Sequence, residues 1–329
     1  MPLFNKLKEP IFLNPASEVD QQVDAMKAMM PKLDNEGKTM VLRDIKRLEY
    51  GAAGEKQVAF ELTNSHMPMY VLRDINLEYN GLNAQIDFIV ITRKLIFVIE
   101  CKNLYGDIEI NSKGEFIRTV SFEGRKYKEG MYSPITQNKK HLELMKKIRV
   151  DATDNTVFKL TRDRLFDNFN RSVVVLANPK TVLNDRYAKK EVKKQVIRAD
   201  QLIAFIKSEC EASKEASGSD DDMLKLAQFY LERNVDHEVE YLKRYEKYMG
   251  NNNIASDSEL RTALKAWRLR TCHEEGIKAY YIFNDRQMED LILLRPTNTK
   301  ELMNISGFGE KKVEKYGTAI IEIIRSRPC

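Results

Sequence analysis

Two apolar runs of the chain carry charges at positions where a buried strand would normally exclude them. Asp87 opens the first run, and Glu100 and Lys102 end the second. Because side chains alternate between the two faces of a strand, Glu100 and Lys102 should point to one side and Cys101 to the other. Two carboxylates and an amine at one sheet edge can hold a divalent cation and activate water for attack on phosphate. This is the chemistry of a nuclease.

A tight turn must bring these two runs together. Arg93 and Lys94 lie between them, so the runs can pair as an antiparallel hairpin that places Asp87 near Glu100. The two carboxylates would then supply hard oxygen ligands for Mg²⁺ or Mn²⁺, and the backbone carbonyl of Cys101 would be a further ligand. The sequence therefore predicts a metal site at the open end of a hairpin.

Lys102 would orient the attacking water or stabilise the charge that develops on the phosphate. A competing interpretation is a structural ion network, because a single Glu-x-Lys after a strand is usually no more than that. Cys101 is interpreted as a small buried apolar residue and not as a nucleophile.

Helices and further strands are expected around this hairpin. Strands are expected at residues 69–77, 85–92, 95–101, 172–178 and 196–198, with a second hairpin over 107–123. Helices are expected at 16–30, 134–149 and 200–207, and residues 48–55 lead into another that continues to about residue 62. Residues 210–254 form a linker and a charged helix, in which the acidic triplet Asp220–Asp222 is a solvated helix start. The last part is helical, with Leu264, Trp267, Tyr281 and Ile282 as core candidates.

Composition narrows the class of protein. The chain has 329 residues, 31% of them charged, and a formal net charge of +5, which is too mild to imply nucleic-acid binding by itself. Its four cysteines show no zinc-site spacing and are expected to be reduced thiols. No apolar run is long enough to span a bilayer, and the first residues lack a signal-peptide core. We expect a cytoplasmic protein without membrane contact.

Residues 46–165 resemble the nuclease-related domain (NERD) of bacterial proteins, considered a branch of the PD-(D/E)xK, restriction-endonuclease-like superfamily. Four motifs occur in order: Gly51-x-x-Gly54-Glu55, Gln85-Ile86-Asp87, Ile99-Glu100-Cys101-Lys102-Asn103 and Ser133-Pro134-x-x-Gln137-x-x-x-His141. Isoleucine stands where the superfamily name has proline. The resemblance implies that Asp87 and Glu100 bind metal, that Lys102 orients water, and that Glu55 completes the metal site.

The resemblance also gives a role to the helix at 134–149. Gln137, with His141 four residues later, is similar to the Gln-x-x-x-Tyr motif of RecB-like nucleases, with histidine in the tyrosine position. Gln137 can position a phosphate or simply hydrogen-bond a buried backbone group. Lys139 and Lys140 on the same helix can follow a phosphate backbone, although a solvated helix face explains them equally well.

The last 75 or so residues resemble an HRDC domain, the helical module found at the C-termini of RecQ-type helicases and RNase D. Its turn Gly307-Phe308-Gly309, followed by Lys311 and Lys312, can bring backbone amides close to a phosphate. A tight helix-to-helix turn is the alternative. Residues 255–329 contain 13 Lys and Arg against 11 Asp and Glu, a small excess that leaves DNA contact and protein contact equally open.

Together these features predict an α/β fold with a restriction-endonuclease-like mixed central sheet of about five strands flanked by helices, then a helical connector and a small all-α HRDC-like domain. The expected segments are an arm at 1–45, the NERD nuclease-like domain at 46–209, a linker at 210–254 and the HRDC-like domain at 255–329. The expected function is metal-dependent cleavage of DNA, with a DNA-repair or helicase-type protein as partner. A nuclease-like fold kept for DNA binding or protein assembly is the alternative.

Overall fold

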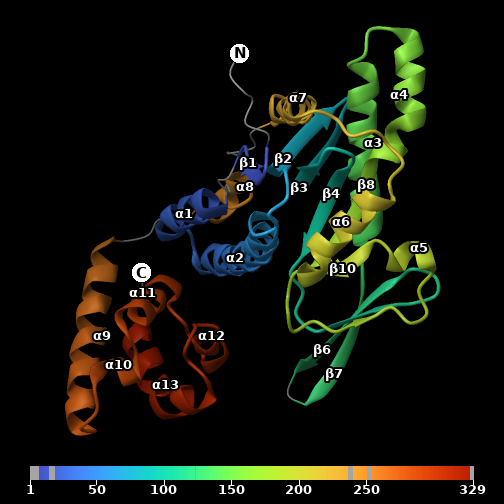
Figure 1. Cartoon of the computed structure of the whole chain (residues 1–329). Helices are drawn as coiled ribbons and strands as arrows, with labels where there is room; N and C mark the ends of the chain where they lie inside the picture. Colours follow the sequence, from blue (N-terminus) through green and yellow to red (C-terminus); the bar gives the residue numbers. More distant parts are fainter. Residues whose placement is uncertain (1–6, 15–18, 123, 236–239, 250–253, 327–329) are drawn as a thin grey trace. The chain divides into compact units, whose positions relative to one another are not determined.

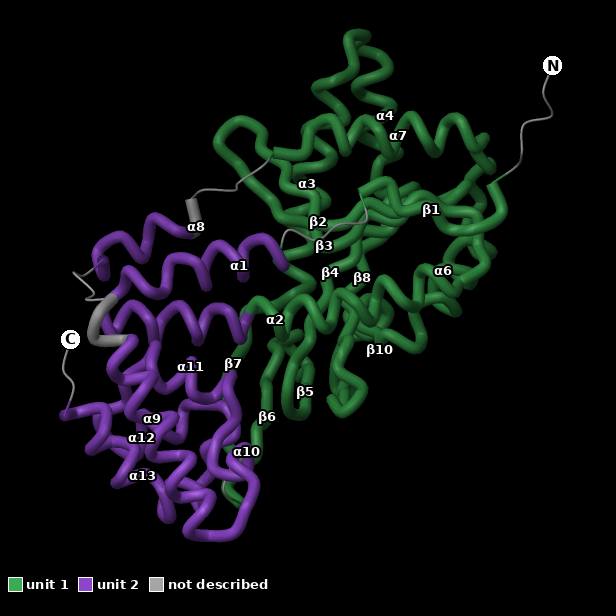
Figure 2. The backbone as a smooth tube through the Cα atoms, turned by 90° about the vertical axis from the view of Figure 1, so that its left-hand side faces the viewer, with its two compact units in different colours: residues 1–19, 48–237 green, residues 20–47, 238–329 purple. Residues whose placement is uncertain are grey.

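The structure is a computed structural model that describes residues 7–14, 19–122, 124–235, 240–249 and 254–326. The chain divides into two compact units, Met1–Val19 with Leu48–His237, and Asp20–Arg47 with Glu238–Cys329 (Figure 2). Residues 20–45 of the expected N-terminal arm, together with residues 46–47, therefore group with the C-terminal residues. Among the described residues no helix is both long and apolar enough to cross a membrane.

The first unit is built on a six-stranded mixed sheet (Figure 1). In spatial order its strands are β1 (Pro10–Phe12), β2 (Met69–Tyr79), β3 (Leu82–Ile91), β4 (Ile96–Lys102), β8 (Asn170–Leu176) and β10 (Val196–Arg198). β2, β3 and β4 pair antiparallel, whereas β1 with β2, β4 with β8, and β8 with β10 pair parallel. The expected mixed central sheet is confirmed, with one strand more than the five predicted.

Helices cover both faces of this sheet. On one face, α2 (Asn35–Thr63) contributes Val58 and Leu62 to the core, together with residues of α6 (Leu202–Ala212). On the other face lie α3 (Pro134–Asp151), α4 (Thr156–Phe169) and α7 (Asp220–Leu231), whose apolar residues pack on β2 and β3. Each core is formed by side chains of alternate strand residues, as expected of a sheet buried on both faces.

The first unit also contains a second sheet, of which the sequence predicted only one hairpin. Its strands are β7 (Arg125–Met131), β6 (Phe116–Phe122), β5 (Asp107–Ile110) and β9 (Leu183–Asn184). The expected hairpin over residues 107–123 is confirmed as β5 and β6, and β7 extends it (Figure 1). β7 was missed because its sequence, RKYKEGM, has no apolar alternation and its residues are almost all exposed.

Residues 220–222 begin α7 as predicted. Ser219 is the N-cap, accepting from the backbone N–H of Asp222, and the acidic side chains occupy the first turn. The short α5 (Lys190–Lys193) precedes β10, and a 3₁₀ turn, Ala199–Gln201, leads into α6. α2 begins at Asn35, earlier than expected, so residues 48–55 lie within the helix instead of leading into it; no proline interrupts its sequence.

The second unit is helical. Residues 35–47 of α2 belong to it. Its other elements are α1 (Val19–Met29), a 3₁₀ turn at Met30–Lys32, α8 (Glu240–Lys243), a 3₁₀ turn at Glu246–Tyr248, α9 (Ile254–Glu274), α10 (Ala279–Ile282), α11 (Asp285–Leu294), α12 (Thr299–Met303) and α13 (Glu310–Arg325). Leu264 and Ile282 lie in its core, and Trp267 stacks on Phe283 with ring centroids 6.1 Å apart. The prediction for Tyr281 is wrong. Its side chain is 60% exposed, because the single turn of α10 directs Ile282 inward and Tyr281 into solvent.

Candidate nuclease site

The β3–β4 hairpin forms with the predicted turn. The register pairs Ile91 with Ile96 and Phe88 with Ile99, and the backbone N–H of Thr92 donates to the carbonyl of Leu95 at 2.9 Å. Asp87 and Glu100 follow directly after the last recorded pair. The hairpin therefore brings the two carboxylates to one end of the β3–β4 ladder.

Beside Asp87, the alternation of side chains between the two faces of the sheet shifts by one residue in both β2 and β3. Asp74 of β2 has a positive φ of 52°, and Leu72 before it and Ile75 after it pack in the same core although they are three residues apart. β3 changes phase opposite this point, and no pair is recorded between Asp74 and Asp87. The irregularity gives a charged side chain a place in a strand whose inward positions are otherwise apolar.

Asp87 is tied to the neighbouring strand. Its Oδ2 accepts a hydrogen bond from the backbone N–H of Cys101 at 2.6 Å. The Cys101 side chain packs on the core beneath α2, whereas Glu100 and Lys102 face α3, as strand alternation predicted. Burial raises the pKa of the Cys101 thiol well above its usual range, so its role as a small buried residue fits its surroundings.

Lys102 joins β4 to α3. Its Nζ lies 2.6 Å from Glu100 Oε1 and donates to Gln137 Oε1 at 3.2 Å. Ser133 caps the start of α3 and Pro134 fills the first turn, which sets Gln137 one turn into the helix. The structure thus brings together four of the residues singled out in the sequence: Asp87, Glu100, Lys102 and Gln137.

Asn138 holds α3 in this position, and sequence reasoning missed it. The side chain is fully buried, and its Nδ2 donates to the carbonyls of Val98 at 2.7 Å and Val173 at 3.2 Å. It therefore bonds α3 to β4 and β8 at once, through hydrogen bonds that are buried. In the sequence, only the position of Asn138 among the apolar residues of the helix, next to Gln137, could have indicated this role.

Glu55 reaches the site from α2. Its Oε2 accepts a hydrogen bond from the buried Arg73 guanidinium at 3.0 Å, and its charge contributes to raising the pKa of Asp87. Burial raises the pKa of Glu55 itself, while Arg73 opposes that rise. Arg73 was not singled out in the sequence, where a lone arginine in a strand carries no motif. The assignment of Glu55 as a metal ligand stays a prediction.

The carboxylates of the site are held out of water and repel each other. Burial, followed by the charge of Glu100, raises the pKa of Asp87 well above its usual range. Burial also raises the pKa of Glu100, although Lys102 opposes the rise, and Glu100 Oε2 is buried without a hydrogen bond from any described residue. Repelling carboxylates with an unused oxygen suit a divalent cation. Within the described ranges, however, no three His, Cys, Asp or Glu side chains form a group that could hold a metal.

His141 faces Glu100 without bonding to it. Its Nδ1 lies 3.7 Å from Glu100 Oε2, and both atoms are buried without a hydrogen bond to the described residues. Burial and the nearby Lys102 lower the pKa of His141 to about 4. The imidazole is therefore neutral at pH 7 and adds no charge to the site.

Protein stability should depend on pH through His141. The folded pKa of about 4 lies below the ordinary 6.5, so the unfolded chain takes up the proton first as pH falls. This contribution is complete above about pH 6.5 and is lost as pH falls toward 4, a loss of about 3 kcal/mol. Urea unfolding of the first unit at pH 7 and pH 4.5 should show a smaller acid loss in His141→Gln than in wild type. Equal losses would contradict the assignment, and the exposed His273→Gln is the control.

The first unit exposes basic and aromatic side chains on α3 and on β7. Lys139 and Lys140 are exposed on α3, and Lys140 Nζ lies 5.4 Å from the ring centre of the exposed Tyr132. β7, absent from the sequence prediction, exposes Arg125, Lys126 and Lys128 around Tyr127, which is 53% exposed. Cations interleaved with exposed rings are typical of surfaces that bind single-stranded nucleic acid.

The remaining candidate residues lie in the second unit. Gly307 has a φ of 87°, and a Cβ there would approach the Gln287 side chain to 1.9 Å, so the turn requires glycine. Gly309 is the N-cap of α13, and Phe308 between them is buried in the core. Lys311 is exposed, whereas Lys312 lies 5.5 Å from the Phe308 ring centre. The tight-turn interpretation explains Gly307, and the phosphate-contact interpretation stays a prediction.

Comparison with protein families agrees with both resemblances. Residues 50–177 match the model of the nuclease-related domain, NERD, and residues 257–324 match that of the HRDC domain. The chain contains a NERD domain and an HRDC domain. The NERD match covers the motifs that contribute Glu55, Asp87, Glu100, Lys102 and Gln137.

Individual relatives match at the HRDC domain. The ATP-dependent DNA helicase UvrD2 of Mycobacterium tuberculosis is 38% identical over 71 residues, 22% of this chain and 10% of the helicase. The ATP-dependent DNA helicase RecQ of Bacillus subtilis is 30% identical over 73 residues, 22% of this chain and 12% of the helicase. The solved D. radiodurans RecQ HRDC domain 3 is 31% identical, with 21% of this chain and 92% of that chain covered and a TM-score of 0.21. The chain spans about a tenth of the length of these helicases.

Proposed function

We propose that this protein is a divalent-metal-dependent nuclease that hydrolyses phosphodiester bonds in DNA. The observation that carries the proposal is the pair of Asp87 and Glu100, two carboxylates held together in a NERD domain with Lys102 2.6 Å from Glu100. Holding like charges out of water costs stability. Such a cost is typical of a functional site, where it is offset by a bound cation or substrate.

Asp87, Glu100 and the backbone carbonyl of Cys101 are the groups that would hold Mg²⁺ or Mn²⁺. The bound ion would polarise the scissile phosphate and lower the pKa of a water molecule. Lys102 would place a positive charge beside the reacting phosphate and would orient the water through its ammonium group. Gln137 fixes Lys102 through a hydrogen bond, so it acts as a positioning residue. Glu55, paired with Arg73, lies close enough to Asp87 to influence its ionisation.

DNA is the proposed substrate because the HRDC domain is shared with two DNA helicases. In the first unit, Lys139 and Lys140 would follow the phosphate backbone near the site. In the second unit, the amides beside Gly307 and Gly309, with Lys311 and Lys312, would make a weaker phosphate contact. A DNA-repair or helicase-type protein is the proposed partner. The affinity of Lys311→Ala for a labelled oligonucleotide tests this contact, and an affinity equal to that of wild type would remove Lys311 from it.

Cleavage assays test the catalytic proposal. Wild type, Lys102→Ala and the exposed control Lys113→Ala would be incubated with supercoiled plasmid, linear duplex, single-stranded DNA and RNA, in Mg²⁺, Mn²⁺ or EDTA. Wild type and the control should cut DNA only with metal, and Lys102→Ala should be slower by a factor on the order of 100 or more, because it lacks the charge beside the phosphate. Full activity in a purified, folded Lys102→Ala protein would refute the role of Lys102.

One observation favours a second candidate, a DNA-binding or assembly module without turnover. Asp87 already accepts from the Cys101 backbone and Glu100 already pairs with Lys102, so a structural ion network is formed without a metal. Calorimetric titration with Mn²⁺ separates the two functions. Binding by wild type that Asp87→Ala loses supports the nuclease, whereas DNA binding without metal binding or cleavage supports the module.

A further inference from the structure

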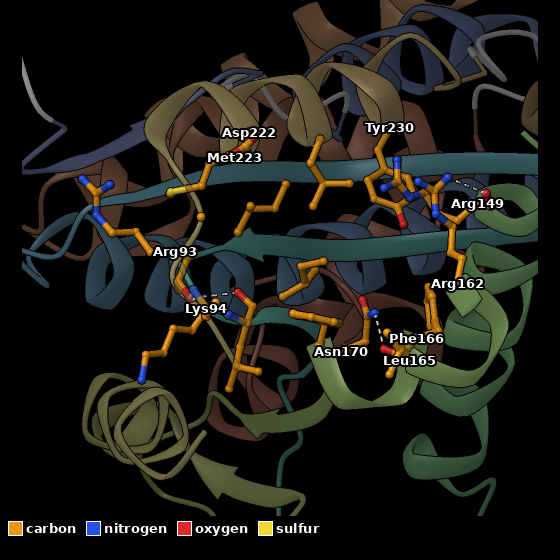
Figure 3. A pocket seen from close by; sticks show the side chains of 18 of the residues that line it. Arg93, Lys94, Arg149, Arg162, Leu165, Phe166, Asn170, Asp222, Met223 and Tyr230 are labelled. Carbon is orange, nitrogen blue, oxygen red and sulfur yellow. Dashed lines mark hydrogen bonds between the residues drawn. The ribbon is translucent and has the colours of Figure 1, made fainter. Parts of the chain in front are cut away.

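A cavity of about 600 Å³ lies in the first unit at the end of the sheet where β3 turns into β4. Residues 91–96 of that turn, together with parts of α3, α4 and α7, surround it (Figure 3). Glu100 and Lys102 stand at the opposite end of β4, and neither lines this cavity. The volume is in the range of roughly 300–1,000 Å³ that is usual for small-molecule sites. The cavity is therefore separate from the candidate nuclease site.

Most of the cavity wall is apolar. Side chains of β4, α4 and α7 contribute to it: Ile96, Phe158, Leu165, Phe166, Met223 and Leu226. Phe158 is 65% exposed and Leu165 41% exposed, although both belong to a helix packed on the core. Apolar surface left open beside a cavity would be removed from water by an apolar occupant, at a gain of about 25 cal/mol per Å².

One end of the cavity is polar. Figure 3 shows Arg149 of α3, Arg162 of α4 and Tyr230 of α7 gathered there. Tyr230 is completely buried, and its hydroxyl makes no hydrogen bond with any described residue. A buried hydroxyl without a partner costs about 1–3 kcal/mol, so this group calls for an acceptor that the described protein does not supply. Burial raises the pKa of Tyr230, which keeps the hydroxyl protonated and able to donate.

The two arginines at this end carry charges that no carboxylate of the described residues neutralises. Neither forms an ion pair with a carboxylate of the described residues, and the Arg149 guanidinium makes only a ring contact, 4.6 Å from the Phe229 ring centre. Arg162 donates to two neutral oxygens, the carbonyl of Arg149 and Thr153 Oγ1. Burial, assisted by the charges of Arg162 and Arg233, lowers the pKa of Arg149. Two guanidinium groups that pair with no described carboxylate therefore lie beside the buried hydroxyl of Tyr230.

The cations at the other end of the cavity are satisfied. Arg93 pairs with Asp220, and Lys94 Nζ donates to the carbonyl of Ser213 at 3.2 Å. Figure 3 shows Arg93 and Lys94 well away from Arg149 and Arg162. An anionic group entering the cavity would therefore be attracted to the end with Arg149 and Tyr230, and its apolar part would lie along the wall.

We propose that this cavity binds a small amphipathic anion, with a carboxylate or phosphate head at Arg149, Arg162 and Tyr230 and an apolar body against α4 and α7. A guanidinium binds either head through paired, charge-assisted hydrogen bonds. The site is independent of the proposed nuclease activity, because no residue of that site lines the cavity.

Isothermal titration of the full chain with octanoate, octyl phosphate and 1-octanol tests the proposal. The three probes share one apolar chain and differ in the head. At least one anion should bind with one-to-one saturation and at least tenfold more tightly than octanol, since one charge-assisted contact contributes about 1.5–3 kcal/mol. The tighter anion identifies the head. Failure of both anions to saturate, or an affinity equal to that of octanol, overturns the proposal.

Three variants locate the binding. Arg149→Met keeps an apolar stem beside Phe229 and removes the charge, so it should weaken anion binding about tenfold and leave octanol binding unchanged. Tyr230→Phe removes only the hydroxyl and should weaken anion binding about three- to tenfold. Arg125→Met, exposed on β7, removes a charge outside the cavity and should change nothing. Unchanged anion affinity in Arg149→Met overturns the proposal, and if that variant does not fold, unchanged affinity in Tyr230→Phe does so.

Discussion

Asp87→Asn is expected to abolish metal-dependent cleavage and at the same time to raise the thermal stability of the metal-free protein. Asparagine has nearly the same shape as aspartate, and its side-chain oxygen can still accept from the Cys101 backbone N–H. The substitution removes a charge that is desolvated and repelled by Glu100 and Glu55. Removing a charge that burial and its neighbours oppose should stabilise the metal-free fold.

The measurement is a pair of thermal melts, in EDTA and in millimolar Mg²⁺, beside the cleavage assay. In EDTA, Asp87→Asn should melt about 2–4 °C above wild type for each kcal/mol gained in the first unit. Mg²⁺ should raise the melting temperature of wild type, because it binds the folded form, and should leave the variant unchanged. Asp107→Asn, at an exposed position of β5, is the matched control. A variant that melts lower than wild type in EDTA, or that still cleaves, would show that Asp87 is a structural acid.

The raised pKa values of Asp87 and Glu100 also predict how the stability of the metal-free protein changes with pH. A carboxyl whose folded pKa is raised binds its proton more tightly in the folded state, so metal-free stability falls as pH rises through the interval between the unfolded and folded pKa values. Asp87 and Glu100 therefore make the metal-free protein less stable as pH rises, whereas His141 makes it more stable. The same carboxyls must be ionised to hold a cation, so the metal-dependent gain in stability should grow as pH rises.

The β3–β4 hairpin could be predicted from the sequence because residues close together in the chain specify both its strands and its turn. Strand alternation alone separates Lys102 from Cys101, and the two-residue spacing in Glu-x-Lys sets both charges on one face. The change of phase at Asp74 could not be found in this way, because an αL aspartate is not distinguishable by type from any other. Asn138 and Arg73 were missed for a related reason: their partners lie on other elements, at sequence separations of 40 and 18 residues.

Elements without an amphipathic pattern were also missed. β7 is polar on both faces, and its pairing with β6 gives it the form of a strand. α4 exposes Val157, Phe158 and Leu160 to solvent, so its apolar residues do not mark an inward stripe. The cavity beside α4 depends on four elements distant in sequence, and neither Arg149 nor Tyr230 belongs to a recognisable motif. Tertiary packing alone brings these residues together.

Gly54→Ala is expected to destabilise the first unit and to impair cleavage, whereas Gly51→Ala in the same motif should be tolerated. A Cβ at Gly54 would lie 2.5 Å from the Asn103 Cβ and 3.3 Å from the Ala177 Cβ. These atoms belong to the segments that follow β4 and β8, so α2 would have to move outward from the ends of both strands. Such overpacking typically costs about 1–3 kcal/mol. Glu55 is the next residue of α2, and it would move with the helix.

Gly51 supplies the matched control because no atom lies within 4 Å of a Cβ built there. Alanine is the better helix former, so Gly51→Ala should raise stability by about 0.5–1 kcal/mol and leave cleavage unchanged. Urea unfolding and the plasmid assay on both variants compare the same chemical change one helical turn apart. If Gly54→Ala were as stable and active as Gly51→Ala, the close approach of α2 to Asn103 would not be needed to position Glu55. A loss confined to Gly54→Ala would show that the second glycine of the motif sets the distance between the helix and the site.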